Sequence, residues 1–366
     1  MRGSAVIVGA GIAGLATARG LLKAGWSVQV LERSPGLPGT GTALGMWPEA
    51  MRALDQLGVG ERVRAASVEQ RGARLLRPDG TEIARVGPGR SGRLVPRPAL
   101  LAALAEGLPP DVVAWNAPAT DHGALPAADV IVAADGVHSP VRAALFGVAP
   151  RPLGTVALRG TVPGPADGVT ETWGPARLFG ITPHDAERTN WFASVCADVL
   201  AAAASGRDDA QALQRLYGDW HPDVRRVLAA LGNTPIDRRT LLDVPPLPSY
   251  VRGHTVLLGD AAHGMAPNLG RGACEALLDA TALVEALSAA SDVPGALHRH
   301  DAVRRRPTVR TVRLARLANR VGTARHGLAV RNAVVAAAAR LSWRGRGQPL
   351  ATGTSRGRRS SGSWWW

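Results

Sequence analysis

The sequence predicts an α/β protein in which one discontinuous domain with parallel strands is interrupted by a smaller α+β sheet domain and followed by a C-terminal helical segment. Three observations predict this class. A strand, a glycine-rich turn, a helix and a second strand follow one another within the first 32 residues. Apolar strands that end beside an aspartate and a glycine recur at 129–134 and 255–258. Between them, residues 151–250 alternate between apolar and polar side chains and are rich in Pro, Gly and Trp, which is typical of a separate sheet.

The first element is a strand–turn–helix–strand unit. A buried strand precedes Gly9, and the second strand ends at Glu32. Gly9 permits a tight turn, Gly11 lets backbone approach a pyrophosphate, and Gly14 lets the helix pack closely on the strand. The helix start offers free N–H groups to phosphates, and an acid 18 residues after Gly14 suits ribose hydroxyls. The unit therefore predicts a Rossmann-like dinucleotide site; the alternative is a glycine-rich turn that binds nothing.

The strand at 129–134 continues directly into Asp135 and Gly136. Gly136 permits a sharp turn, while Ser139 and Pro140 suit the N-cap and the first position of a helix. A plain capped helix would explain Ser139 and Pro140 but not the preceding Asp-Gly pair. The motif therefore predicts a second carboxylate at the edge of the sheet.

The strand at 255–258 ends in Gly259 and Asp260, and a carboxylate there can hydrogen-bond a polyol chain. Downstream, Gly270 and Gly272 keep the start of the next helix free of side chains. The positive end of that helix dipole can stabilise negative charge on a bound ring.

Charge is concentrated near the C-terminus. The net charge is +14, yet residues 299–366 hold 16 arginines and one acid, so the rest of the chain is close to neutral. Nucleic-acid binding is therefore not expected. Five arginines recur at helical spacing and predict one basic stripe: Arg306, Arg310, Arg313, Arg316 and Arg320. Residues 342–366 end in three tryptophans and predict a disordered basic tail, for which contact with a membrane or an acidic partner is an alternative to simple solvation.

Other features set the cellular context. Two cysteines are too few for a disulfide framework, so a reduced, cytoplasmic setting is expected. No uncharged apolar segment reaches the length of a membrane-spanning helix. We expect no metal site, because the ligand-type residues His298, His300 and Asp301 lie in a basic helical segment.

Together these motifs resemble the family of FAD-dependent aromatic hydroxylases, which has the para-hydroxybenzoate hydroxylase fold of GR2-type flavoproteins. The salicylate hydroxylase and zeaxanthin epoxidase-like branch is the most similar. The resemblance extends from Ala5 to about Arg331 and covers four motifs in the family's order. These are Gly9–Gly14 with Glu32, Arg97-x-x-Leu100-x-x-x-Leu104, Asp135-Gly136 and Gly259-Asp260.

The resemblance implies a set of FAD-binding residues: Gly9, Gly11, Ala13, Gly14, Glu32, Arg33, Arg97, Asp135, Gly136, Gly259, Asp260, Pro267, Gly270 and Gly272. It also implies that the segment 42–48 passes near the flavin ring. Arg159 matches an arginine of the substrate sheet and can anchor an anionic or phenolic substrate, or else be a solvated strand residue. No catalytic residue is assigned, although His263 is a weak candidate for moving a proton. Two departures from the family pattern are Glu49 and Arg271, where many relatives have Asn and Gln.

The implied reaction is that of a monooxygenase. NADPH or NADH reduces the flavin, which reacts with O₂ to give a C4a-hydroperoxide that hydroxylates or epoxidises an aromatic or conjugated small molecule. The alternatives are a flavin-dependent reductase or dehydrogenase without oxygen insertion, and a non-catalytic flavin-binding protein. The expected FAD-binding domain comprises 1–70, 96–150 and 251–341, and the expected substrate-binding domain comprises 71–95 and 151–250.

Overall fold

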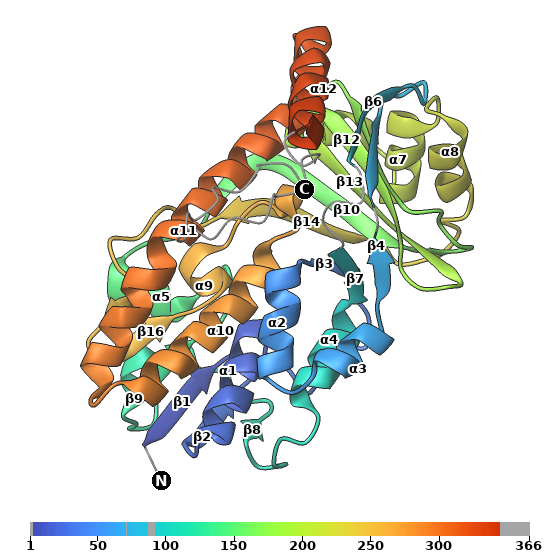
Figure 1. Cartoon of the computed structure of the whole chain (residues 1–366). Coiled ribbons are helices and arrows are strands. Elements are labelled where there is room, and N and C mark those ends of the chain that lie inside the picture. Colours follow the sequence, from blue (N-terminus) through green and yellow to red (C-terminus); the bar gives the residue numbers. More distant parts are fainter. Residues whose placement is uncertain (1–2, 71, 87–91, 345–366) are drawn as a thin grey trace, which may run out of the picture. The chain divides into compact units, whose positions relative to one another are not determined.

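The structure is a computed structural model that describes residues 3–70, 72–86 and 92–344 (Figure 1). The chain forms two compact units. Unit 1 takes its described residues from Met1–Glu69, Gly92–Thr155 and Arg239–Asn319. Unit 2 takes them from Gln70–Ser91, Val156–Arg238 and Arg320–Trp366. The expected first domain continued to residue 341, whereas the division falls after Asn319. Most of the predicted tail, residues 345–366, lies outside the described part of the chain.

The main sheet of unit 1 has the strand order β15-β16-β9-β1-β2-β8. β1 pairs in parallel with β2 and β9, and β16 pairs in parallel with β9. Val8 and Leu257 both pair with Ala133, so β1, β9 and β16 end at one edge of the sheet. The strands are β1 (Ser4–Val8), β2 (Ser27–Leu31), β8 (Val113–Ala114), β9 (Val130–Ala133), β15 (Val251–Arg252) and β16 (Thr255–Leu257).

Helices cover this sheet and bury its apolar side chains. α1 packs along α10, and an added Cβ on Gly20 would lie 2.6 Å from Val284, so the two helices approach closely. Ile7, Leu15 and Leu277 are completely buried between them and the strands. The helices are α1 (Ile12–Lys23), α2 (Pro48–Gln56), α3 (Gly60–Ala65), α4 (Arg97–Ala105), α5 (Pro140–Phe146), α9 (Asp260–His263) and α10 (Gly272–Ala289), with 3₁₀ turns at His122–Ala124 and Pro267–Leu269.

A small sheet of order β3-β7-β4 comprises β3 (Ala43–Met46), β7 (Gly92–Pro96) and β4 (Val68–Gln70). β3 runs antiparallel to β7, which continues directly into α4. This pairing brings the backbone of residue 42 to the start of α4, where Arg97 N donates to Thr42 O at 3.2 Å.

Unit 2 is built on a sheet of order β14-β10-β13-β12-β11-β5-β6. One face packs against three helices and buries Leu158, Phe179 and Trp191, whose neighbours in the strands face the other side. The strands are β5 (Ala73–Leu76), β6 (Glu82–Val86), β10 (Arg151–Pro163), β11 (Val169–Gly174), β12 (Arg177–Pro183), β13 (Arg188–Cys196) and β14 (Asp237–Asp243). The helices are α6 (Ala197–Ala204), α7 (Asp209–Tyr217) and α8 (Pro222–Ala229).

The C-terminal helical segment consists of two helices rather than one. They are α11 (Val293–Gly322) and α12 (Leu328–Arg344), separated by residues 323–327. Gly327, which directly precedes α12, has φ of +67°, a left-handed conformation that favours glycine. Among the helices of the described residues, none combines the length and the apolar character needed to cross a membrane.

Candidate FAD-binding site

The glycine-rich turn after β1 has the geometry that its sequence predicts. Gly9 has φ of +100°, and an added Cβ would lie 2.5 Å from the Ala134 carbonyl oxygen. A Cβ on Gly14 would lie 1.9 Å from the Gly9 carbonyl oxygen, so both positions require glycine. A Cβ on Gly11 would have no heavy atom within 4 Å. The backbone at Gly11 is therefore open to a ligand, although nothing in the protein itself excludes a side chain there.

The start of α1 can bind an anion. Its N-cap is Gly11, and no side chain caps the free N–H groups of the first turn, which includes Ala13. Uncapped N–H groups together with the positive end of the helix dipole form a site for phosphate.

Glu32 is held against this turn by backbone hydrogen bonds. Its carboxylate accepts from Ala10 N at 2.7 Å and from Ser34 N at 2.9 Å. Burial alone would raise the pKa of Glu32, but these hydrogen bonds and the charge of Arg33 bring it below the usual value. Glu32 is thus an ionised acceptor fixed beside the glycine turn, and Arg33 lies next to it.

Asp135 lies at the same edge, after β9. Its Oδ2 accepts from Val141 N at 3.3 Å, while Oδ1 is buried and has no hydrogen-bond partner among the described residues. Burial raises the pKa of Asp135. Gly136 has φ of +83°, and Ser139 caps α5 by accepting from Arg142 N at 2.9 Å, as the sequence predicted.

The Gly259–Asp260 pair follows β16 at the third strand end. An added Cβ on Gly259 would lie 3.2 Å from Ala13 Cβ, so this turn packs on the start of α1. Asp260 reaches solvent, yet protein surrounds it so densely that burial raises its pKa, against the opposing charges of His263 and Arg97. Arg97, at the start of α4, is therefore close enough to act on Asp260 electrostatically.

The loop that leads into α10 completes this edge. Gly270 has φ of +57° and follows the 3₁₀ turn that begins at Pro267. A Cβ on Gly272 would lie 3.9 Å from Asp260 Oδ1, and no side chain caps the start of α10. The predicted segments thus meet at the ends of β1, β9 and β16.

Four buried side-chain atoms in these segments have no partner among the described residues: Trp47 Nε1, Asp135 Oδ1, His263 Nδ1 and Asn268 Oδ1. Buried polar groups are normally satisfied, so a polar ligand bound at this edge would account for such atoms. The donors and acceptors, the two uncapped helix starts and the open backbone at Gly11 all fit a dinucleotide.

Sequence reasoning missed a buried network of charges behind the site. His263 Nε2 lies 2.5 Å from Asp279 Oδ2, and Arg304 contacts Asp279 at 2.7 Å and Glu275 at 2.6 Å. Gly259 N also donates to Asp279, at 2.9 Å. Burial alone would raise the pKa of Asp279, but the charges of His263 and Arg304 lower it. His263 is therefore a buried partner of Asp279, and its side chain does not reach solvent.

The two departures from the family pattern pair with each other. Arg271 donates to Glu49 at 2.7 Å and to Glu275 at 2.9 Å. The network thus continues from buried Asp279 to the partly exposed Arg271 and Glu49 at the start of α10. Next to it, His300 has two buried ring nitrogens without partners in the described chain, and burial lowers its pKa to about 4.

In unit 2, the predicted substrate residue Arg159 forms an ion pair with Asp237 at 2.8 Å, and both are partly exposed.

The structure adds a second candidate substrate residue, which the sequence did not predict. Glu171 on β11 is 5% exposed, and its carboxylate accepts only one hydrogen bond that the structure assigns, from Trp173 Nε1 at 2.7 Å. Burial raises the pKa of Glu171 to about 7. Leu158, Phe179 and the neighbours of Glu171 face the helices, so Arg159 and Glu171 lie on the opposite face of the sheet.

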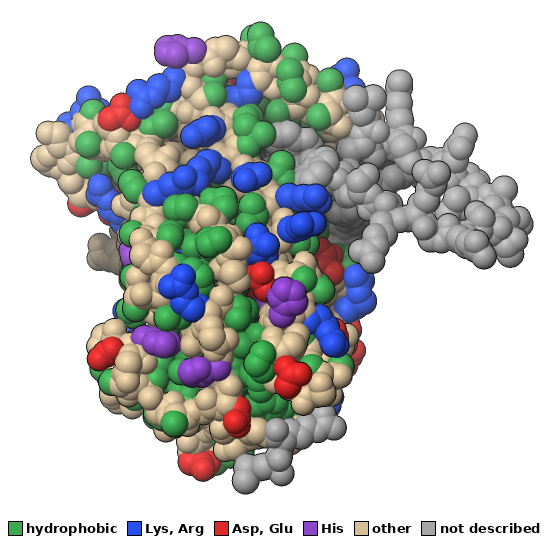
Figure 2. Space-filling model, turned by 90° about the vertical axis from the view of Figure 1, so that its left-hand side faces the viewer, with side chains coloured by type: hydrophobic (Ala, Val, Ile, Leu, Met, Phe, Trp, Pro, Cys, Tyr) green, Lys and Arg blue, Asp and Glu red, His purple; other side chains and the backbone are tan. Residues whose placement is uncertain are grey.

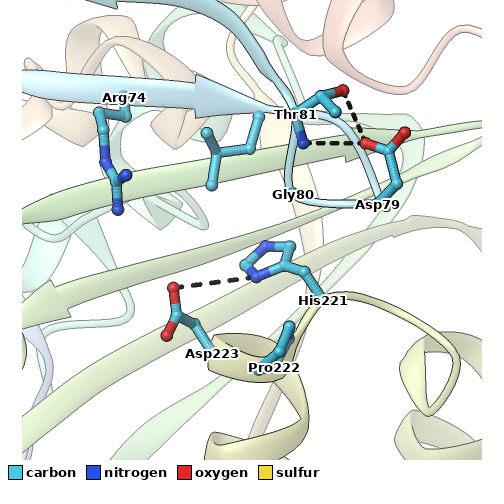
Figure 3. Close-up of a pocket in the computed structure, with 8 residues that line it drawn as sticks. Arg74, Asp79, Gly80, Thr81, His221, Pro222 and Asp223 are labelled. Atoms are coloured by element: carbon cyan, nitrogen blue, oxygen red, sulfur yellow. Dashed lines mark hydrogen bonds and ion pairs between the residues drawn. The ribbon is translucent and has the colours of Figure 1, made fainter.

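Unit 2 also contains a cavity of about 380 Å³ between the β5–β6 turn and the start of α8 (Figure 3). Figure 3 shows Arg74 and Asp223 extending from opposite sides beside His221, whose Nε2 lies 2.8 Å from Thr172 Oγ1. Burial lowers the pKa of His221. None of the predicted cofactor residues lines this cavity, and its charges are of mixed sign, so it indicates no particular ligand.

Comparisons with known proteins agree with this geometry. The family described as "FAD binding domain" matches residues 2–106 and 119–314. An aurachin C monooxygenase/isomerase of Stigmatella aurantiaca is 33% identical over 82% of this chain and 84% of its own length. A 3-amino-4-hydroxybenzoate 2-monooxygenase of Streptomyces cremeus is 33% identical over 86% and 84%. The structure of HpxO from Klebsiella pneumoniae with FAD and uric acid has a TM-score of 0.80 and 24% identity, covering 92% of both chains, and supports the fold.

Proposed function

This chain belongs to the FAD binding domain family and is an FAD-dependent monooxygenase; we propose that its substrate is a small aromatic compound that carries a hydroxyl or N–H donor. The observation that carries the cofactor assignment is the convergence of three strand ends and two uncapped helix starts at one sheet edge. The observation that carries the substrate class is Glu171, the one buried acid among the described residues of unit 2.

Each part of the edge has a role toward FAD. The start of α1 and the open backbone at Gly11 bind the pyrophosphate, and Glu32 accepts from the adenosine ribose. Asp135 and Asp260 accept hydrogen bonds from the polyol part of the cofactor. The uncapped start of α10, at Gly270 to Gly272, would hold the polar edge of the flavin.

When bound, FAD accepts hydride from NADPH or NADH and activates O₂. The protein contributes fixed dipoles and charge compensation. The uncapped N-terminus of α10 would stabilise negative charge on a ring bound at this helix start. Glu49 and Glu275 hold Arg271 at this helix start, so its charge is compensated within the protein. His263 and Arg304 keep Asp279 ionised, and Asp279 in turn fixes the backbone of Gly259.

The face of the unit 2 sheet that lies opposite α6–α8 recognises the substrate in this proposal. Glu171 is buried there, and one of its carboxylate oxygens has no assigned partner. Because a carboxyl group with a pKa near 7 can either accept or donate a hydrogen bond, it suits a phenolic hydroxyl or a ring N–H. Arg159 is a second anchor on the same face, with Asp237 balancing its charge when no anion is bound. By its name, the relative from Streptomyces cremeus acts on 3-amino-4-hydroxybenzoate, an aromatic compound that carries a hydroxyl and an amino group.

The experiment is a panel of matched aromatic pairs, in which each phenol is compared with its O-methylated form. The substrate class predicts that phenols accelerate NADPH or NADH oxidation and gain one oxygen atom, whereas the methylated forms do not. Glu171→Gln should weaken the discrimination between the members of a pair. Glu187→Gln, at an exposed turn of the same sheet, should not. Equal activity on both members of every pair, in wild type and in Glu171→Gln, would contradict the substrate assignment while leaving the monooxygenase intact.

A further inference from the structure

The outward face of α11 is a row of arginines and apolar side chains. Arg299, Arg306, Arg310 and Arg313 are exposed, and so is Arg320 in the last turn. Val303 and Leu317, which are 58% and 51% exposed, stand in the same row. These positions recur at intervals of three and four residues, which places them within about 100° of one another around a helix of 3.6 residues per turn. We call this row the α11 stripe.

The arginines of α11 divide into two sets. Three are paired: Arg304 with Asp279 and Glu275, Arg305 with Asp301, and Arg316 with buried Asp243. Arg316 had been predicted to belong to the exposed row, but it faces unit 1 instead. The five arginines of the stripe form no ion pair with any described residue. The helix holds one acid, Asp301, which is occupied by Tyr250 N and Arg305.

The large exposed apolar side chains, like the unpaired arginines, are concentrated on the C-terminal helices. Four large hydrophobic side chains are exposed in the described part of the chain, and all four lie on α11 or α12: Val303, Leu317, Val330 and Val334. Figure 2 views the side of the molecule on which α11 lies, and shows Lys and Arg side chains scattered among hydrophobic ones there. The opposite face of α11 is buried, with Leu297, Thr308 and Ala315 at 0% exposure. The stripe is therefore rigidly presented by a helix that the protein core holds in place.

We propose that the α11 stripe is a docking surface for an anionic lipid membrane. Unpaired guanidinium groups fit lipid phosphates, and at a rise of 1.5 Å per residue the stripe extends over about 32 Å, so its arginines can contact several headgroups at once. The exposed apolar residues of the stripe favour a lipid surface over a nucleic acid as its partner. Val303 and Leu317 gain by entering the acyl boundary of a bilayer but gain nothing from a phosphate backbone. No aromatic side chain stands in the stripe to stack on a base. The helix lies on the membrane and does not cross it.

The test is co-sedimentation of the full chain with vesicles of phosphatidylcholine alone and of phosphatidylcholine mixed with phosphatidylglycerol. The wild type should bind the mixed vesicles and not the neutral ones, and added salt should weaken the binding. The triple variant R306Q/R310Q/R313Q should bind about a hundredfold more weakly, since each basic residue at a lipid surface contributes about fivefold. The matched control R52Q/R215Q/R225Q removes the same charge from three other exposed helical positions and should bind like the wild type.

A second variant tests the apolar contribution. V303S/L317S keeps every charge, so it should still be attracted at low salt but should lose the binding that persists at high salt. Thermal unfolding and retained FAD should match the wild type in both stripe variants, because all substituted side chains are exposed. Equal loss of binding in the stripe variant and in R52Q/R215Q/R225Q would show a non-specific charge effect and overturn the proposal. So would unchanged binding of the stripe variant, which would assign the interaction to another segment, or absence of wild-type binding to either vesicle.

Discussion

Replacing Gly11 by alanine should impair FAD binding without disturbing the fold. Gly11 has φ of −77°, which alanine adopts freely, and an added Cβ would meet no protein atom within 4 Å. The apoprotein should therefore lose less than ~1 kcal/mol, the usual difference between glycine and alanine at an N-cap. A bound pyrophosphate must approach this backbone closely, so the same methyl group should weaken FAD affinity at least about tenfold, or ~1.4 kcal/mol.

Gly14→Ala provides the contrast. Its Cβ would lie 1.9 Å from the Gly9 carbonyl oxygen, so α1 must move away from the turn. Forced overpacking of this kind costs about 1–3 kcal/mol, even without the cofactor. Gly123→Ala is the control, because its Cβ would make an ordinary contact of 3.4 Å with Asp121. It should change neither property.

The assay combines thermal unfolding of the apoprotein with titration of FAD, followed by quenching of flavin fluorescence. Gly11→Ala should leave the unfolding temperature of the apoprotein unchanged and weaken FAD binding, whereas Gly14→Ala should lower both the unfolding temperature and the FAD affinity. Wild-type FAD affinity in Gly11→Ala would refute the placement of the pyrophosphate at this turn. Equal destabilisation of the two apoproteins would refute the packing argument.

Two further predictions concern buried charges. Arg304→Met removes the partner that Asp279 and Glu275 share, although His263 and Arg271 still contact them. It should lower the free energy of unfolding by about 3–5 kcal/mol, whereas Arg320→Met on the same helix should change it by under about 0.5 kcal/mol. Similar denaturation midpoints for the two variants would contradict this prediction. Burial in the folded state raises the pKa of Glu171 from 4.5 to about 7. Between these two pH values the folded protein retains a proton that the unfolded chain releases. The free energy of unfolding should therefore fall as the pH rises from 4.5 to about 7. Glu171→Gln should remove this decrease in the free energy of unfolding, which amounts to up to ~3 kcal/mol. An unfolding midpoint with the same pH dependence in Glu171→Gln and in the wild type would refute the prediction.

Local motifs were predictable because one stretch of chain contains all of the required atoms. The glycine turn, the Glu32 acceptor and the Ser139 cap depend on residues a few positions apart or on one strand–helix–strand unit. Their geometry follows from steric limits and hydrogen bonding within that unit. The meeting of the strand ends followed from parallel pairing, since the ends of parallel strands lie at one edge.

The buried network could not be predicted, because its members come from distant parts of the chain. Glu49 and Arg271 are 222 positions apart, and each alone resembles a surface residue. Arg316 shares the helical spacing of the exposed arginines, and only the position of buried Asp243 shows that it faces inward. The alternating pattern of its strand predicts that Glu171 faces solvent. In the structure, neighbouring side chains on the same face, such as Trp173, cover Glu171 instead.

The most direct test of the central claim is an anaerobic titration of the FAD-loaded protein with NADPH and then NADH, followed by readmission of O₂ with and without an aromatic substrate. We expect bleaching of the flavin absorbance that the aromatic compound accelerates, and a product that has gained one oxygen atom from O₂. Bleaching followed by turnover that needs no O₂, with no oxygenated product from any phenol, would instead identify a reductase. Failure to bind FAD at all would contradict the account from its first step.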